Sequence, residues 1–117
     1  MKDIVRIELD KDIVYGDSFR LSIIAEGVEI GYVDGTFTEE GFFMELIYIE
    51  AEYRGKGYGT KAMELFKKMA KDVYNVGFIK GDCPGIRSRF YRRLGAIFEC
   101  RDEYDEDYIN DVFYIDL

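Results

Sequence analysis

The chain has 117 residues and a mass of 13.7 kDa, so residues 1–117 are expected to form one domain. Hydrophobic residues make up 48% and charged residues 34%, a composition that excludes a disordered chain. The absence of His excludes Ser–His and Cys–His catalysis, and Cys83 and Cys100 are interpreted as structural thiols with no metal site. No apolar run approaches the roughly 20 residues of a membrane span, and charges interrupt the first residues. These features predict a cytoplasmic protein with no membrane partner.

The net charge of −8 is unevenly distributed along the chain. Residues 1–53 carry 4 basic and 13 acidic side chains, residues 54–93 carry 11 and 3, and residues 94–117 carry 1 and 8. An acidic protein with one basic internal block is a poor candidate for binding nucleic acid. The block either binds a small polyanion or forms a solvated helix face that meets acidic neighbours.

The first half of the chain reads as strands. Alternating apolar and polar residues predict strands over residues 4–9, 20–25 and 28–37, the last two forming a hairpin around Glu26 and Gly27. Residues 42–49 are apolar on both faces of the expected strand, except at Glu45. This pattern predicts a central strand covered on both faces.

The second half mixes helices with strands. Residues 59–73 predict an amphipathic helix with Ala62, Phe66, Met69 and Val73 on its apolar face, and residues 76–79 predict a buried strand. Pro84 suits the first turn of a short helix that contains Ile86, Phe90 and Leu94 and ends at Gly95. Residues 96–100 and 112–117 predict the last strands. The expected fold class is α/β, with a mixed, mostly antiparallel sheet and two main helices.

A glycine-rich loop joins the expected central strand to the first helix. It contains Arg54, Gly55, Lys56, Gly57, Tyr58, Gly59, Thr60 and Lys61. A helix N-terminus offers unpaired backbone N–H groups and a positive dipole end to an anion, so the loop predicts a phosphate site, although glycines here are often only a turn. The glycine spacing is G-x-G-x-G, which excludes a Walker loop and a dinucleotide fingerprint.

Arg54, Gly57 and Gly59 resemble the acetyl-CoA loop of the GNAT superfamily of N-acetyltransferases, which has Arg or Gln, two residues, Gly, one residue, and Gly or Ala. Residues 46–69 are similar to that family's fourth strand, loop and third helix, and residues 88–99 resemble its second signature, Phe-Tyr, two residues, Leu-Gly. Residues 112–117 are similar to its usual last strand. The resemblance implies a GNAT-like fold and acetyl-CoA as co-substrate.

The resemblance also implies roles for individual residues. The backbone amides from Gly55 to Thr60 would hold the CoA pyrophosphate, and Ile47, Tyr48 and Ile49 would hydrogen-bond the pantetheine arm. Tyr91 occupies the family's general-acid position, where a phenol can protonate the departing thiolate; alternatively, Tyr91 is a core residue. Arg87 and Arg89 either reach the CoA phosphates or are solvated.

Two departures from the family pattern affect what is expected. Pro84 stands where the second signature usually has Asn, so one pantetheine contact is expected to be missing. Only about ten residues separate the first two strands, where the family normally places two helices. Either the acceptor is large and brings its own surface, or another subunit completes the site as in a homodimer, or transfer has been lost and CoA binding remains.

An amine acceptor is cationic at neutral pH and must lose a proton before it attacks a thioester. Glu45 is the first candidate base, because strand alternation places it on the same face as Ile47 and Ile49, and Glu50 is the second; alternatively, Glu45 pairs with a cation on a neighbouring strand. Seven acidic residues between Glu99 and Asp111 either gather a cationic amine or form a solvated loop. The leading hypothesis is direct acetyl transfer to a cationic primary amine, which is either a small amine such as a polyamine or an aminoglycoside, or a protein lysine or N-terminus. The alternatives are a non-catalytic acyl-CoA-binding module and an acidic protein-interaction domain.

Overall fold

The computed structural model describes residues 4–9, 11–84, 88–98 and 110–117. In this part of the chain, seven strands form one sheet in the order β1-β2-β3-β4-β5-β7-β6. The strands are β1 (Arg6–Leu9), β2 (Ser18–Ala25), β3 (Val28–Phe37), β4 (Phe42–Ile49), β5 (Phe78–Pro84), β6 (Ile97–Phe98) and β7 (Asn110–Asp116). The helices are the 3-10 turn η1 (Ala51–Tyr53), α1 (Tyr58–Asp72) and α2 (Ser88–Arg93). The expected mixed, mostly antiparallel sheet with two main helices is confirmed.

Strands β1 to β4 form a continuous antiparallel meander. The β2–β3 turn lies at Glu26 and Gly27, which have φ values of 54° and 80°. Left-handed backbone at both positions is the signature of a tight hairpin turn, so the predicted hairpin is confirmed.

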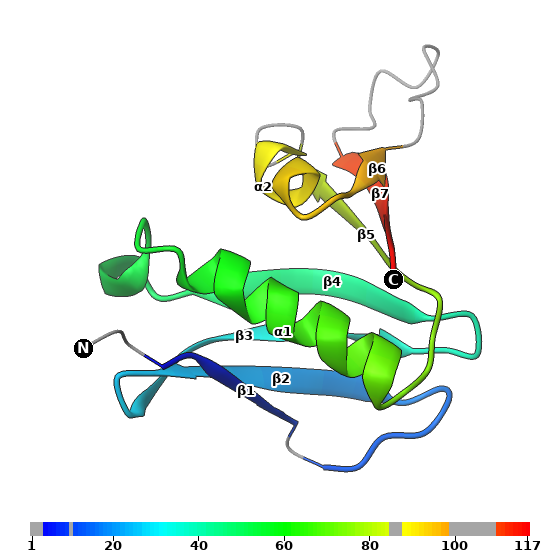
Figure 1. Ribbon diagram of the computed structural model, residues 1–117, viewed down its shortest axis with the longest axis horizontal. Coiled ribbons are helices and arrows are strands. Elements are labelled where there is room, and N and C mark those ends of the chain that lie inside the picture. Colours follow the sequence, from blue (N-terminus) through cyan, green and yellow to red (C-terminus); the bar gives the residue numbers. More distant parts are fainter. Residues whose placement is uncertain (1–3, 10, 85–87, 99–109) are drawn as a thin grey trace.

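Strands β4 and β5 run parallel but pair at only three positions, Phe42 with Ile79, Phe43 with Lys80 and Met44 with Gly81. Beyond Met44 the two strands separate, as Figure 1 shows for β4 and the diagonal β5. Strand β5 pairs with β7 along its whole length, at seven antiparallel positions, and its last three residues pair with β7 alone. Among the described residues, the edge of β4 that faces away from β3 therefore has no strand partner beyond Met44.

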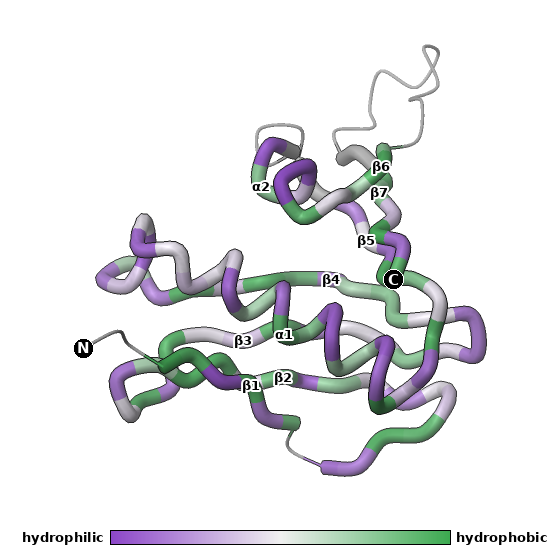
Figure 2. The backbone as a smooth tube through the Cα atoms, in the orientation of Figure 1, coloured by the Kyte–Doolittle hydropathy of each residue, from purple (hydrophilic) through white to green (hydrophobic). Residues whose placement is uncertain are grey.

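Helix α1 packs its apolar face against the strands of the meander. Figure 2 shows hydrophilic and hydrophobic residues alternating along this helix. Phe66 of α1 is fully buried and meets Phe42 of β4 edge-on, with ring centroids 5.2 Å apart. Phe19 and Tyr74 also pack against the Phe42 ring. Each buried aromatic side chain contributes on the order of 2–3 kcal/mol of hydrophobic stabilisation, so this cluster fixes α1 on β4.

The prediction that β4 is covered on both faces is wrong. Phe43, Leu46 and Tyr48 are 37%, 41% and 38% exposed, whereas Phe42 and Met44 are buried on the side of α1. The short connection between β1 and β2 contains no helix in the described residues, so nothing there covers the second face.

Several element limits also differ from those predicted. Pro84 is the last residue of β5 rather than the first turn of a helix, and α2 begins at Ser88. Proline is tolerated at this strand end, where β5 has already separated from β4. Strand β5 begins at Phe78 instead of residue 76, and it continues through Gly81 and Asp82 because the ladder with β7 holds residues of low strand propensity. Val73 is 70% exposed at the C-cap of α1 and so lies off its apolar face.

Candidate active site

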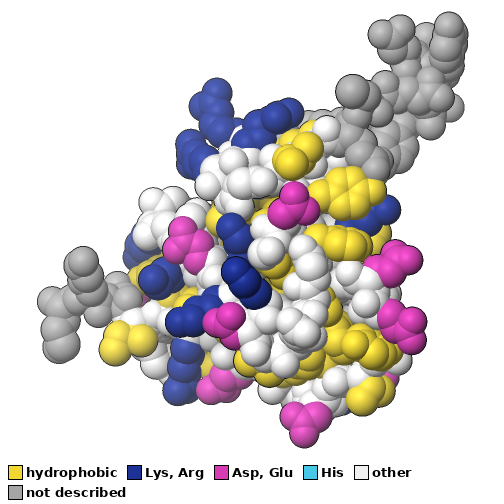
Figure 3. Space-filling view, turned by 45° about the vertical axis from the view of Figure 1, so that its right-hand side comes forward, with side chains coloured by type: hydrophobic (Ala, Val, Ile, Leu, Met, Phe, Trp, Pro, Cys, Tyr) yellow, Lys and Arg dark blue, Asp and Glu magenta, His cyan; other side chains and the backbone are white. Residues whose placement is uncertain are grey.

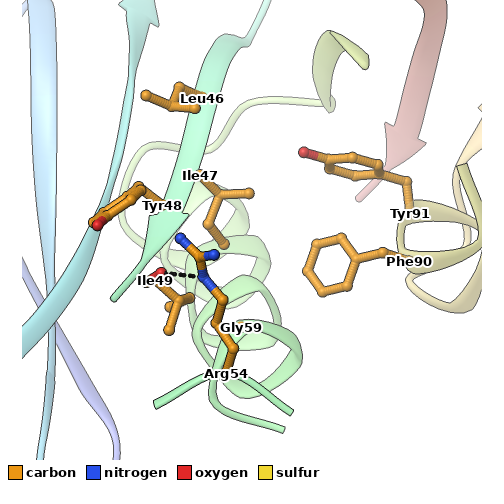
Figure 4. Close-up of a pocket in the computed structure, with 8 residues that line it drawn as sticks. All are labelled: Leu46, Ile47, Tyr48, Ile49, Arg54, Gly59, Phe90 and Tyr91. Atoms are coloured by element: carbon orange, nitrogen blue, oxygen red, sulfur yellow. Dashed lines mark hydrogen bonds between the residues drawn. The ribbon is translucent and has the colours of Figure 1, made fainter. Parts of the chain in front are cut away.

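A cavity of about 570 Å³ occupies the place where β4 and β5 separate. Its lining comes from β4, the start of α1 and helix α2: Leu46, Ile47, Tyr48, Ile49, Arg54, Gly59, Phe90 and Tyr91. Figure 4 shows Ile47 of β4 pointing toward the rings of Tyr91 and Phe90 across the cavity. We call this cavity the cleft. The sequence placed five of its eight residues in the cofactor site and a sixth, Tyr91, in catalysis.

The backbone of β4 presents hydrogen-bonding groups to the cleft. The N–H of Glu50 donates to the carbonyl of Ile30 in β3, at 2.8 Å. Because alternate residues of a strand bond to opposite sides, the backbone groups of Ile47 and Ile49 point away from β3 and toward the cleft. An extended ligand lying there can pair with them as an added strand does.

A β-bulge interrupts β4 at Glu45. Asp34 pairs with Leu46 whereas the next residue, Gly35, pairs with Met44, so Glu45 is the extra residue. The bulge changes which alternate residues face α1: Phe42 and Met44 before it, Ile47 and Ile49 after it. The prediction that Glu45 shares a face with Ile47 and Ile49 is therefore wrong. Its side chain is exposed and lines a second cavity, separate from the cleft.

The glycine loop ends in a helix N-terminus that no side chain caps. Gly57 is the N-cap of α1 with φ of 84°, and Gly55 has φ of 77°, both in the left-handed region that favours glycine. The first bond of the helix runs from the N–H of Lys61 to the carbonyl of Gly57. The N–H groups of Gly59 and Thr60 lie in this first turn and have no acceptor within the helix, which is what an anion site at a helix N-terminus requires.

Tyr58 holds the glycine loop in place. Its side chain is buried, and its hydroxyl donates to the Glu26 carboxylate at 3.0 Å, which ties the start of α1 to the β2–β3 turn. Tyr58 therefore positions the start of α1. Lys56 and Lys61 remain exposed beside the loop.

Tyr91 forms the wall opposite β4. Its ring is 4% exposed and stacks on Phe113 of β7 with centroids 4.2 Å apart. Phe90 meets it edge-on at 5.0 Å. Figure 4 shows the Tyr91 hydroxyl directed toward β4, so the ring is fixed by packing while its polar end faces the cleft.

Helix α2 is anchored to α1 at two points. Lys67 of α1 donates from Nζ to the carbonyl of Leu94 just beyond α2, at 2.9 Å. Phe90 packs over Gly59, where an added Cβ would lie 3.6 Å from the ring. These contacts set the width of the cleft between Ile49 and Tyr91.

Arg54 directly follows η1 and lines the cleft. Its Nε donates to the carbonyl of Ile49 at 2.6 Å, drawn as the dashed line in Figure 4, and its guanidinium carbon is 5.5 Å from the Tyr48 ring centroid. Arg54 thus occupies one of the strand-edge carbonyls of β4 while keeping other N–H donors for a ligand.

Basic side chains gather over α2 and along α1, as the dark blue atoms of Figure 3 show. Arg89, Arg92 and Arg93 on α2 are not buried, and Lys61, Lys68 and Lys71 are exposed on α1. Arg87 and the acidic run from Glu99 to Asp111 lie outside the residues whose side chains the structure describes. In the described ranges, no group of three or more Cys, Asp or Glu side chains is arranged to hold a metal ion.

Sequence reasoning missed Leu46 and Phe90 as cleft residues and Lys67 as the anchor of α2. Phe90 precedes Tyr91 directly, and its aromatic character was the available signal. The bond from Lys67 to Leu94 joins residues 27 apart in sequence, and no local pattern reveals such a contact.

Comparison with known families decides the relationship. The family described as "Acetyltransferase (GNAT) domain" matches residues 17–95, which include the meander, the glycine loop and Tyr91. The chain belongs to the GNAT acetyltransferase family. It is therefore an acetyltransferase whose co-substrate is acetyl-CoA, and the cleft of this GNAT domain lies within the matched region. No curated protein matches the sequence.

Solved structures show the same fold at low sequence identity. A protein of Klebsiella pneumoniae named as an acyl-CoA N-acyltransferase has a TM-score of 0.71 and 21% identity, over 86% of this chain and 72% of that one. PaiA N-acetyltransferase of Thermoplasma acidophilum, solved with coenzyme A, has a TM-score of 0.71 and 16% identity, over 86% and 62%. A Bacillus anthracis protein named as a streptothricin acetyltransferase, solved with acetyl coenzyme A, has a TM-score of 0.69 and 14% identity, over 98% and 87%. Among the described helices, none is long and apolar enough to cross a membrane.

Proposed function

We propose that this GNAT domain binds acetyl-CoA in the cleft and transfers the acetyl group directly to a primary amine. The observation that carries the proposal is the unpartnered edge of β4 beside Tyr91, with the uncapped N-terminus of α1 at the same end of the strand. These features match an extended amide-containing chain attached to a pyrophosphate.

The N–H groups of Gly59 and Thr60 receive the pyrophosphate, and Lys56, Lys61 and Arg54 add positive charge nearby. The pantetheine amides pair with the backbone of Ile47 and Ile49. This arrangement directs the thioester along β4 toward the bulge, between Leu46 and the Tyr91 hydroxyl.

The reaction needs an acid for the departing sulfur. The amine nitrogen attacks the thioester carbon, a C–N bond forms, and the C–S bond breaks with both electrons on sulfur. Tyr91 then supplies its phenolic proton to the thiolate, so CoA leaves as a thiol. The nitrogen loses its extra proton as the amide forms, and this proton restores the Tyr91 phenol. Its buried, stacked ring holds the hydroxyl in one position, which favours proton transfer.

The reaction also needs a group that takes a proton from the ammonium form of the acceptor. Glu45 is assigned this role because its exposed carboxylate sits at the bulge, one residue before Leu46 of the cleft. Glu50 lies at the far end of β4, after Ile49, and is the less suitable candidate.

A non-catalytic acyl-CoA-binding module is the second candidate function, favoured by the uncovered face of β4 where acceptor-binding helices would lie. Release of CoA thiol from acetyl-CoA in the presence of a panel of amines discriminates the two. Amine-dependent thiol release, with the acetylated amine identified by mass, supports transfer. Binding of acetyl-CoA with no release for any amine contradicts transfer and supports the binding module.

A further inference from the structure

A second cavity, of about 340 Å³, lies at the bulge of β4. Its lining comes from the β1–β2 connection and strands β2, β3 and β4: Lys11, Ser18, Phe19, Arg20, Asp34, Gly35 and Glu45. Glu45 of this cavity and Leu46 of the cleft are consecutive, so their Cα atoms are about 3.8 Å apart. We call this cavity the bulge pocket.

The bulge pocket holds four charged side chains of both signs. Arg20 and Asp34 satisfy each other in a two-pronged pair, with Nε and one terminal guanidinium nitrogen each 2.7 Å from a carboxylate oxygen. The Asp34 carboxylate raises the pKa of Arg20, and the guanidinium also lies 3.8 Å from the Tyr32 ring centroid. This pair is fixed and forms one wall of the pocket.

The other two charges, Lys11 and Glu45, are uncommitted. Within the described part of the chain, no hydrogen bond or ion pair joins either side chain to another residue. The pocket therefore presents one available cation and one available anion, and its four charges sum to zero. A polycation would meet Lys11 as a like charge, whereas a molecule with an amine and a carboxylate finds a partner for each.

We infer that the acceptor of this transferase is a small zwitterion, an amine that also carries a carboxylate, bound in the bulge pocket. The inference rests on the proposed amine transfer and specifies its substrate. Glu45 faces the reacting amine at the bulge, where the thioester arrives, and Lys11 holds the acceptor's carboxylate. The chemistry is shared by free amino acids and short peptides.

The test compares two amines that differ only by the carboxylate, L-lysine and cadaverine. We expect wild-type protein to have a higher kcat/KM for L-lysine. Lys11→Met removes the cation, and we expect it to lower kcat/KM for L-lysine by about two- to fivefold, the range for one exposed ion pair, with little change for cadaverine. Lys71→Met, which removes an exposed lysine from the last turn of α1, is the matched control and should leave both values unchanged. The dipeptide Gly-Lys, assayed alongside, distinguishes a peptide acceptor from a free amino acid.

A binding measurement keeps the inference independent of turnover. Titration of ¹⁵N-labelled protein with L-lysine should shift the backbone amide signals of Ser18 and Gly35, and the same titration of Lys11→Met should shift them less. Equal kcat/KM or equal shifts for L-lysine and cadaverine in wild type, or a preference that survives Lys11→Met, would overturn the inference. Absence of any shift with L-lysine and with Gly-Lys would also overturn it. Failure of the proposed function is seen separately, as acetyl-CoA that binds in calorimetry but releases no thiol with any amine of the panel, or that does not bind at all.

Discussion

Replacing Tyr91 by Phe removes a single hydroxyl from the cleft and leaves the packing of the ring in place. The ring is 4% exposed and stacks on Phe113 at 4.2 Å, and Phe retains both this contact and the edge-on contact with Phe90. We therefore expect the free energy of unfolding to fall by no more than about 1.5 kcal/mol, the net value of one hydrogen bond.

The effect on catalysis should be far larger than the effect on stability. Loss of a general acid lowers the rate of the chemical step by roughly 10²–10⁴-fold, equivalent to about 3–5 kcal/mol of transition-state stabilisation. Affinity for acetyl-CoA should change little, because the N-terminus of α1 and the backbone of β4 are untouched.

The assay is single-turnover acetyl transfer to an active amine, which measures the chemical step without interference from slow product release. Calorimetry with CoA measures binding in parallel. Tyr74→Phe is the matched control, since it removes a hydroxyl from a ring packed on Phe37 and Phe42, outside the cleft. A Tyr91→Phe rate within about twofold of the Tyr74→Phe rate would refute the assignment of Tyr91 as the acid.

Three further predictions follow from the same geometry. Gly57→Ala and Gly57→Glu should each lower the free energy of unfolding by about 1 kcal/mol, because both place a side chain at φ of 84°, with open space around the added Cβ. Only Gly57→Glu should abolish CoA binding in calorimetry. Equal CoA affinities of the two variants would argue against a pyrophosphate beside Gly57. Glu45→Gln should lower kcat/KM at pH 7. The loss of kcat/KM relative to wild type should be much smaller at pH 9, where more of the acceptor amine is already neutral. An equal loss at both pH values would speak against Glu45 as a base. Burial raises the pKa of Tyr74, with Asp12 a smaller cause, so the folded state holds this proton more tightly than the unfolded state. The resulting stability is present below pH of about 10 and is lost above it. In urea unfolding, the free energy of unfolding of Tyr74→Phe should therefore fall less than that of wild type as the pH rises.

Short-range patterns in the sequence predicted much of the fold. The limits of β3, predicted from alternation, and of β4, predicted from its apolar run, are those of the structure. The apolar spacing of Ala62 and Phe66 placed α1 within one residue at each end. The glycine spacing predicted a strand-to-helix loop that ends at a helix N-terminus, and the structure has Gly57 as the N-cap of α1 with no side-chain cap.

Long-range pairing limited what the sequence could predict. The bulge at Glu45 depends on how Asp34 and Gly35 of β3 pair with β4, so simple alternation assigned Glu45 to the wrong face. Pro84 belongs to a strand because β7 pairs with it, and that ladder involves residues far along the chain. The bulge pocket likewise gathers Lys11, Asp34 and Glu45 from separate segments, which no local motif marks.

The central claim is that acetyl-CoA lies along β4 with its pyrophosphate at the start of α1. A crystal structure of the protein with acetyl-CoA tests this most directly. We predict pyrophosphate oxygens within hydrogen-bond distance of the N–H groups of Gly59 and Thr60, pantetheine paired with Ile47, and the sulfur beside the Tyr91 hydroxyl. Acetyl-CoA bound elsewhere, or bound with its pyrophosphate away from the glycine loop, would contradict the account.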